Sequence, residues 1–465
     1  MKVTQVALRP TQASNEANRP ALTPELLAAT GARYSRSNDG LNAILAKIDP
    51  DNPDKSIDAI FRFIDFGHQS VADMVPVALF MDGISMWLAY HIWSLCPTAG
   101  GQESSTRYIQ LAPENLPDAA AVGIPESGRD DWRSSMNEAL ENYETALAFW
   151  HDVAERDPSV MRIPAALLND DSDKASKAVA RMKRNYAFDR ARYFLPAALQ
   201  TNVMMIQSAR AWVNLCQQLF SHPLPEAQQL AARIRDELEL VAPRMIKHAA
   251  PSASFARGLE IEWKQLINIA WMTMNSAPAP EFDVAGVRSN PRLEVWGAPD
   301  DNGAIFAEDL MGHDTRYAFI GEELRRTPVR FGWGQIAFGD IRDLNRHRTG
   351  TKVCLLMPWG FYGATDQTDD ADYHQLAARG AALAGKCMEA LRAGQASFVY
   401  WMNLGAQFDF EHTTTADKFI YEAELRTGVG AHYRYASHLR EVLQLWYEKF
   451  PATRGVILEG SAEPE

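Results

Sequence analysis

Apolar residues recur at helical spacing in several long segments of the chain. This spacing predicts helices over residues 130–154, 200–219, 226–240, 341–346, 373–391 and 433–450. The most apolar stretch covers residues 75–93, but Asp82 and His91 interrupt it. A membrane span needs about 20 predominantly apolar residues, so we expect a buried helix in this stretch.

Between these helices, residues 276–301 are rich in Pro, Gly, Asn and Asp, which makes this segment the best candidate for a linker. A faint internal repeat is also present. In the first half, Tyr-Phe-Leu-Pro at residues 193–196 precedes a predicted helix, and in the second half an aromatic run at residues 398–401 takes the same place.

Composition narrows the classes of function. The 465 residues carry a net charge of −13, which argues against a nucleic-acid polymer as partner but allows a small anionic nucleotide. The four cysteines form no CxxC pair, and His412, His432 and His438 match no familiar metal site, so we expect neither a disulfide framework nor a bound metal. The start of the chain lacks the apolar core of a signal peptide, so we expect a cytoplasmic protein without membrane attachment.

Two short segments contain the residue types that bind phosphate. Residues 102–108 read Gln-Glu-Ser-Ser-Thr-Arg-Tyr, where a serine hydroxyl and an arginine fork can hold one phosphate. Residues 346–348 read Arg-His-Arg, after a segment at 338–344 in which charged and apolar residues alternate. Charges buried in such a segment need partners, and the phosphate groups of a bound ligand are suitable ones. The simpler interpretations are a polar loop for the first segment and a solvated basic turn for the second.

Together the two segments resemble one motif of the flavin-dependent thymidylate synthases. In that family an Arg-His-Arg triplet is followed, after a short spacer, by Asn-Glu-x-Ser-x-Arg-Tyr. Here residues 95–97 of the first half read Leu-Cys-Pro where the triplet would stand. Residues 354–359 of the second half read Cys-Leu-Leu-Met-Pro-Trp where the rest of the motif would stand. Each half keeps what the other has lost, which indicates a duplicated fold with a composite site.

Further blocks of the sequence extend the resemblance. Residues 67–71 match the family's Gly-His-x-Ser-Val, and residues 191–196 resemble its Ala-Arg-x-x-Leu-Pro. Residues 208–210 read Ser-Ala-Arg where the family has Asn-Ala-Arg. The family's pyrimidine-contacting Leu-Arg is missing from the first half and present at residues 425–426 of the second.

The resemblance implies a role for each matching residue. The residues implied to bind the nucleotide are Ser105, Arg107, Tyr108 and Arg192. Those implied to bind the flavin are His68, Ser70, Arg210, Arg346, His347 and Arg348. Arg426 and Glu103 are implied to take part in the chemistry, Arg426 by stabilising negative charge on the uracil carbonyls.

The same resemblance implies the fold and the reaction. We expect an α+β protein with two tandem helix-rich copies of the family fold, each with a small mixed or antiparallel sheet. Residues 1–255 and 311–465 would be the two repeats, joined by residues 256–310. The implied reaction converts dUMP to dTMP with FAD as cofactor and methylenetetrahydrofolate and NADPH as co-substrates. Because the family forms homotetramers, two such chains are expected to form a homodimer.

Three departures from the family pattern leave alternatives open. Met74 stands where the family has a histidine, Asp73 replaces a glutamate and Gln102 replaces an asparagine. The alternative reaction is another flavin-dependent modification of a pyrimidine nucleotide, such as hydroxymethylation. A non-catalytic relative that binds nucleotide or flavin is the competing class.

Overall fold

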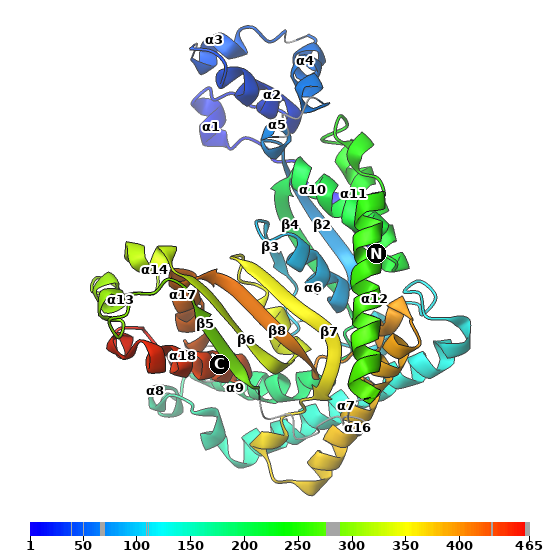
Figure 1. Ribbon diagram of the computed structural model, residues 1–465, viewed down its shortest axis with the longest axis vertical. Helices are drawn as coiled ribbons and strands as arrows, with labels where there is room; N and C mark the ends of the chain where they lie inside the picture. Colours follow the sequence, from blue (N-terminus) through cyan, green and yellow to red (C-terminus); the bar gives the residue numbers. More distant parts are fainter. Residues whose placement is uncertain are drawn as a thin grey trace. The chain divides into compact units, whose positions relative to one another are not determined.

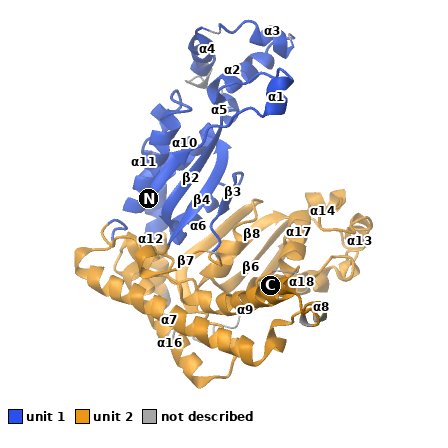
Figure 2. Ribbon diagram, turned by 180° about the vertical axis from the view of Figure 1, so that it is seen from behind, with its two compact units in different colours: residues 1–105, 121–123, 200–264 blue, residues 106–120, 124–199, 265–465 orange. Residues whose placement is uncertain are grey.

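The computed structural model describes the chain apart from residues 39, 50, 66–69, 108, 110, 276–288, 429–430 and 461–465. It forms two compact units (Figure 2). The first consists of residues 1–105, 121–123 and 200–264, and the second of residues 106–120, 124–199 and 265–465. In the part of the chain that is described, no helix is long and apolar enough to cross a membrane.

The first unit is built on a four-stranded antiparallel sheet of order β1-β2-β4-β3. Its strands are β1 (Lys2–Gln5), β2 (Pro76–Ser85), β3 (Gly100–Glu103) and β4 (Gln200–Ser208). The helices that follow the strands are α6 (Met86–Leu95), α10 (Ala209–Ser221) and α11 (Pro225–Glu239). Short helices between β1 and β2 form an N-terminal group: α1 (Gln12–Glu16), α2 (Pro24–Tyr34), α3 (Leu41–Leu45), α4 (Pro53–Asp65) and α5 (Ser70–Asp73).

The second unit repeats this plan with a four-stranded antiparallel sheet of order β5-β6-β8-β7 (Figure 1). Its strands are β5 (Pro291–Val295), β6 (Pro328–Ala337), β7 (Thr351–Phe361) and β8 (Ala406–Thr415). The helices in the equivalent places are α15 (Phe338–Leu344), α17 (Ala416–Thr427) and α18 (Tyr433–Lys449). The unit also contains α7 (Arg129–Arg156), α8 (Ala165–Leu168), α9 (Asp173–Ala191), α13 (Ala304–Asp309), α14 (Glu322–Arg326) and α16 (Ala371–Arg392).

The matching strand orders confirm the predicted helix-rich α+β fold with two copies of one plan. Even the irregularities agree, because both β2 and β6 shift register shortly before their ends. The predicted helices over 130–154, 226–240, 373–391 and 433–450 correspond to α7, α11, α16 and α18.

Two predicted helices are wrong over their first part. Residues 76–85 form β2 and residues 200–208 form β4, and each strand runs directly into a helix. In β4 the apolar residues alternate, with Val203 and Met205 buried and Ile206 43% exposed, which is the period of a strand. The change from strand to helix is marked by a serine: Ser208 accepts a hydrogen bond from the Ala211 amide.

The segment predicted to connect the repeats, 256–310, is largely structured. It contains most of α12 (Ala253–Asn275), β5 and α13. Residues 276–288 of the predicted linker lie outside the described residues. The long helices α7 and α9 come from the first half of the sequence but belong to the second unit. The division into repeats at residues 255 and 311 remains a prediction.

Equivalent segments of the two halves pair with each other inside the second unit. Counted back from the helix starts Ala209 and Ala416, Pro196 and Asn403 hold the same position, and they form a β-bridge. The hydrogen bonds around this bridge are reciprocal: Ala197 N donates to Met402 O at 2.8 Å and Leu404 N donates to Leu195 O at 2.8 Å. Such isologous pairing is what a two-fold axis produces. It also places the start of the 192–196 segment beside α15, where Gly339 N donates to Leu404 O.

Candidate active site

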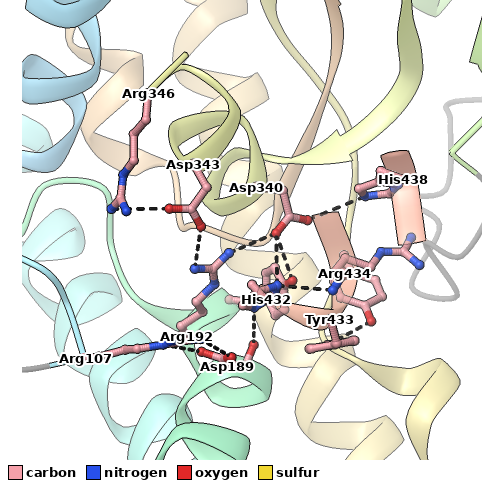
Figure 3. Close-up of polar contacts among 12 residues, drawn as sticks. Arg107, Asp189, Arg192, Asp340, Asp343, Arg346, His432, Tyr433, Arg434 and His438 are labelled. Atoms are coloured by element: carbon pink, nitrogen blue, oxygen red, sulfur yellow. Dashed lines mark hydrogen bonds and ion pairs between the residues drawn. The ribbon is translucent and has the colours of Figure 1, made fainter. Parts of the chain in front are cut away.

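Asp343, near the end of α15, joins residues from both halves of the chain (Figure 3). Its carboxylate accepts from Arg192 Nη1 at 2.8 Å and forms an ion pair with Arg346 Nη2 at 3.3 Å. Burial raises the pKa of this carboxyl, but the charges of Arg346 and Arg192 outweigh burial and hold the pKa well below its usual range. Asp343 is therefore a buried anion that links two arginines predicted to serve the same site.

Arg192 follows α9 and is itself buried. Its second terminal nitrogen, Nη2, donates to Asp340 at 2.9 Å, and the hydroxyl of Tyr193 donates to the same carboxylate at 3.1 Å. A phosphate at Arg192 must therefore compete with two carboxylates. Its predicted contact with the nucleotide phosphate remains a prediction.

Arg107 lies beside this group and makes a bidentate pair with Asp189 of α9, at 3.0 and 2.5 Å. The Asp189 side chain is fully buried, whereas 17% of the Arg107 side chain is exposed. His432 Nε2 lies 3.0 Å from the Asp189 carbonyl, and its Nδ1 accepts from the Arg434 amide. This pattern places the proton on Nε2, and burial lowers the pKa of His432 to about 4, so the ring is neutral at neutral pH.

Arg426 lies near the end of α17 and contacts two residues around the Arg-His-Arg triplet. Its Nε donates to His347 Nε2 at 2.7 Å, and its Nη2 donates to the Asp343 carbonyl at 3.2 Å. The structure therefore brings Arg107 and Arg192 of the first half together with Arg346, His347 and Arg426 of the second.

Arg348 and Lys352 add positive charge close to His347. Arg348 donates to the Asn345 carbonyl at 2.7 Å, and Lys352 donates to the carbonyl oxygens of His347 and Thr349. Burial lowers the pKa of Lys352 to about 8, which leaves the side chain largely protonated at neutral pH.

The cluster contains both cations and carboxylates. Its cations include Arg107, Arg192, Arg346, Arg348, Lys352 and Arg426. Its carboxylates include Asp189, Asp340, Asp343 and Glu422. A ligand with phosphate groups fits such a donor set, because arginine forks bind phosphate oxygens through two hydrogen bonds.

The other predicted site residues belong to the first unit or lie outside the described part of the chain. Glu103 ends β3, Ser105 follows it, and Ser70 begins α5. Arg210 forms an exposed ion pair with Asp73 at 2.8 Å and lines a hollow of about 480 Å³. Tyr108 and His68 are outside the described residues. The predicted roles of these six residues remain predictions.

The sequence did not single out the acidic partners Asp189, Asp340, Asp343 and Glu422. One signal was available: the alternation of charged and apolar residues over 338–344 indicated buried charges in need of partners. For Asp340 and Asp343 the structure shows that these partners include Arg192, which lies 148 and 151 residues away in the sequence.

Part of the chain is similar in sequence to a known protein family. Residues 21–244 match the family model described as thymidylate synthase complementing protein. The chain matches this family model over just under half of its length. The second half of the chain lies outside the matched residues. It contains the Arg-His-Arg triplet and Arg426 of the cluster described above.

The individual relatives of the chain are distant. A UPF0159 protein of Chlamydia pneumoniae is 25% identical over 393 residues, which cover 72% of this chain and 70% of that protein. A UPF0159 protein of Thermoplasma acidophilum is 24% identical over 235 residues, 47% of each chain. A flavin-dependent thymidylate synthase of Clostridium tetani is 23% identical over 231 residues, 49% of this chain and 83% of the synthase.

Among solved structures, a UMP/dUMP methylase from Streptomyces cacaoi, bound with 5-Br dUMP, is similar to part of the chain. The sequences are 15% identical, and the match covers 53% of this chain and 93% of the methylase with a TM-score of 0.31.

Proposed function

We propose that the protein is an FAD-dependent enzyme that methylates C5 of a uridine nucleotide and converts dUMP to dTMP. Methylenetetrahydrofolate would supply the carbon and NADPH the reducing equivalents. One observation carries the proposal: motifs of the flavin-dependent thymidylate synthases are divided between the two halves of this chain, and Arg192, Arg346 and Arg426 from these motifs all contact Asp343.

Two pairs of arginines in the cluster would each bind phosphate groups. Arg346, with 47% of its side chain exposed, and Arg348 would hold the flavin phosphates. Arg107 and Arg192 would hold the nucleotide phosphate, each kept in place by a buried carboxylate. A reduced flavin supplies hydride for this class of reaction.

Arg426 would act on the pyrimidine ring. Two of its nitrogens are held by His347 and by the Asp343 carbonyl, while its Nη1 has no hydrogen-bonding partner among the described residues. A fixed guanidinium beside a uracil carbonyl stabilises the negative charge that develops on the ring when C5 bonds to carbon. In a water-poor site this interaction is stronger than in bulk water.

We further propose that two chains form the working assembly. Each chain already contains two copies of the fold, and closed two-fold symmetry is the commonest arrangement of soluble oligomers.

Purified protein with bound FAD, incubated anaerobically with dUMP, methylenetetrahydrofolate and NADPH, tests the proposal directly. We expect dTMP as the product and bleaching of the flavin absorbance on addition of NADPH. A hydroxymethylated product would instead identify another pyrimidine modification. Flavin or nucleotide binding without turnover would contradict catalysis and favour the non-catalytic class.

A further inference from the structure

Glu422 is a buried carboxylate one helical turn before Arg426 on α17. Only 1% of its side chain is exposed, and Oε2 lies 3.1 Å from His412 Nδ1 and 3.9 Å from His347 Nδ1. Burial raises the pKa of this carboxyl, but His347, His412 and Lys352 outweigh burial and lower the pKa to about 2. A buried anion is costly unless its neighbours depend on its charge, so its place beside the site needs an explanation.

The hydrogen bonds of His347 determine which of its nitrogens carries the proton. His347 Nε2 accepts from Arg426 Nε, so the proton of the neutral ring must be on Nδ1. Burial lowers the pKa of His347 to about 3, which keeps the ring neutral at neutral pH. The protonated Nδ1 therefore lies 3.9 Å from Glu422 Oε2, too far for a hydrogen bond, and the negative charge of Glu422 favours this tautomer electrostatically.

The orientation of His347 in turn fixes Arg426. Because His347 Nε2 holds Nε and the Asp343 carbonyl holds Nη2, the plane of the guanidinium is set, with its carbon 5.3 Å from the centre of the Tyr435 ring. The direction in which the remaining nitrogen, Nη1, can donate a hydrogen bond is then fixed. In the other tautomer His347 Nε2 would carry a proton and could not accept from Arg426.

We propose that Glu422 is a positioning residue that acts through the Nδ1-protonated tautomer of His347 to orient Arg426 toward the substrate ring. The link to substrate rests on the function proposed above. The chain of contacts from Glu422 to Arg426 rests on the geometry alone. The competing explanation is that Glu422 only balances the positive charge of Lys352 in the core.

The same helix offers a matched control. Glu424 is also a fully buried carboxylate paired with a buried histidine, His313, at 2.9 Å, and it accepts from the Leu458 amide. Glu424→Gln removes a buried acid–histidine pair from α17 without touching the Glu422–His347–Arg426 chain. The Glu424→Gln variant therefore measures how much stability is lost when a buried acid–histidine pair is removed from this helix.

The kinetic test is a double-mutant cycle between Glu422→Gln and His347→Gln. The glutamine at 347 keeps an oxygen acceptor for Arg426 but has no tautomer for Glu422 to select. We expect Glu422→Gln to lower kcat by about 10- to 100-fold, with less than roughly a threefold change in KM for dUMP. In the His347→Gln background the same change should lower kcat by less than about twofold, because the two residues act as one unit.

Melting temperatures, measured together with kcat, distinguish a positioning role of Glu422 from a purely structural one. Glu422→Gln and Glu424→Gln should both lower the melting temperature, but only Glu422→Gln should lower kcat by more than about twofold. Equal loss of kcat from Glu422→Gln in both backgrounds, or no loss in the wild-type background, would overturn the proposal.

A measurement without substrate keeps the result distinct from failure of the proposed function. Nitrogen-15 spectra of histidine-labelled protein report the protonated nitrogen of each ring. We expect His347 protonated on Nδ1 in the wild type and a mixture of tautomers in Glu422→Gln. Protonation of His347 on Nε2 in the wild type, or an unchanged spectrum in the variant, would refute the relay even if the enzyme makes dTMP. The expected spectra without turnover would instead refute only the proposed reaction.

Discussion

His91 and Asp343 occupy the same place in the two repeats, since each is the sixth residue of the helix that follows the second strand, counted from Met86 and Phe338. Asp343 joins two arginines in an ionic cluster. His91 instead stacks on Trp87 and lies 5.1 Å from the His222 ring. Burial lowers the pKa of His91 to about 4, so this half-buried cluster is neutral.

A second pair of positions shows the same contrast. Counted from the helix starts Ala209 and Ala416, Leu219 is the counterpart of Arg426, and Leu219 is completely buried. At these two positions the first repeat has uncharged residues where the second has charges, while its sheet keeps the strand order of the second. The fold depends on burial of apolar faces, so charges at single positions can differ between the two copies without loss of the fold.

The largest expected effect is that of Asp343→Asn. The change leaves the buried Arg192 with one carboxylate fewer, and breaking a buried ion pair costs roughly 3 kcal/mol of unfolding free energy. Affinity for flavin and dUMP should fall as well, because Arg192 and Arg346 lose their shared anchor. His91→Asn, at the same place in the first repeat, should cost about 1 kcal/mol or less and leave both affinities unchanged. Urea unfolding and ligand titration of the two variants measure the difference, and equal losses would contradict the contrast.

The Arg346→Ala, Arg348→Ala double variant should lose flavin while staying folded. Each charged hydrogen bond contributes about 1.5–3 kcal/mol, so the affinity for FAD should drop by at least about 100-fold. The Arg346 side chain is half exposed, so the melting temperature should change little. Fluorescence titration with FAD provides the measurement. Unchanged flavin occupancy would show that Arg346 and Arg348 do not bind the flavin.

Arg107→Ala and Arg210→Ala compare one arginine of each unit. Arg107→Ala should weaken dUMP binding by about tenfold to 100-fold, the value of one charged contact. Arg210 is paired with Asp73 on the surface, so its loss should change dUMP affinity by less than about threefold. Calorimetry with flavin present measures both. A larger effect at Arg210 would show that the first unit holds the nucleotide. Flavin affinity of the Arg210 variant tests the flavin contact that the sequence predicts.

The smallest expected effect concerns pH. The pKa of His91 is lowered from 6.5 to about 4, so the folded protein binds its proton less well than the unfolded chain. The stabilisation is complete above about pH 6.5 and is lost as pH falls toward 4. His91→Phe should therefore reduce the loss of unfolding free energy between pH 7 and pH 5 by roughly 2 kcal/mol. Glu422, with a pKa lowered to about 2, should add no pH dependence between pH 7 and pH 5, because its contribution to stability is lost only as pH falls from about 4.5 toward 2. Urea unfolding at both pH values distinguishes the two residues.

The fold was largely predictable because long helices such as α7 and α16 carry an uninterrupted helical period. Strands β2 and β4 were missed because each continues into a helix without a turn, so one apolar stretch combines two periods. The arginines of the site were predictable from the divided motif. Their acidic partners were not, because the pairing of Arg192 with Asp340 depends on segments 148 residues apart that meet only in the folded chain.

The number of ligands bound per chain shows whether the two halves together make one working site. Titration of the purified protein with FAD and then dUMP, with light scattering to fix the number of chains, gives this number. We predict one FAD and one dUMP per chain, and therefore two of each per homodimer. Two flavins per chain would show that both repeats keep a complete site, and a fully active monomer would contradict the dimeric assembly.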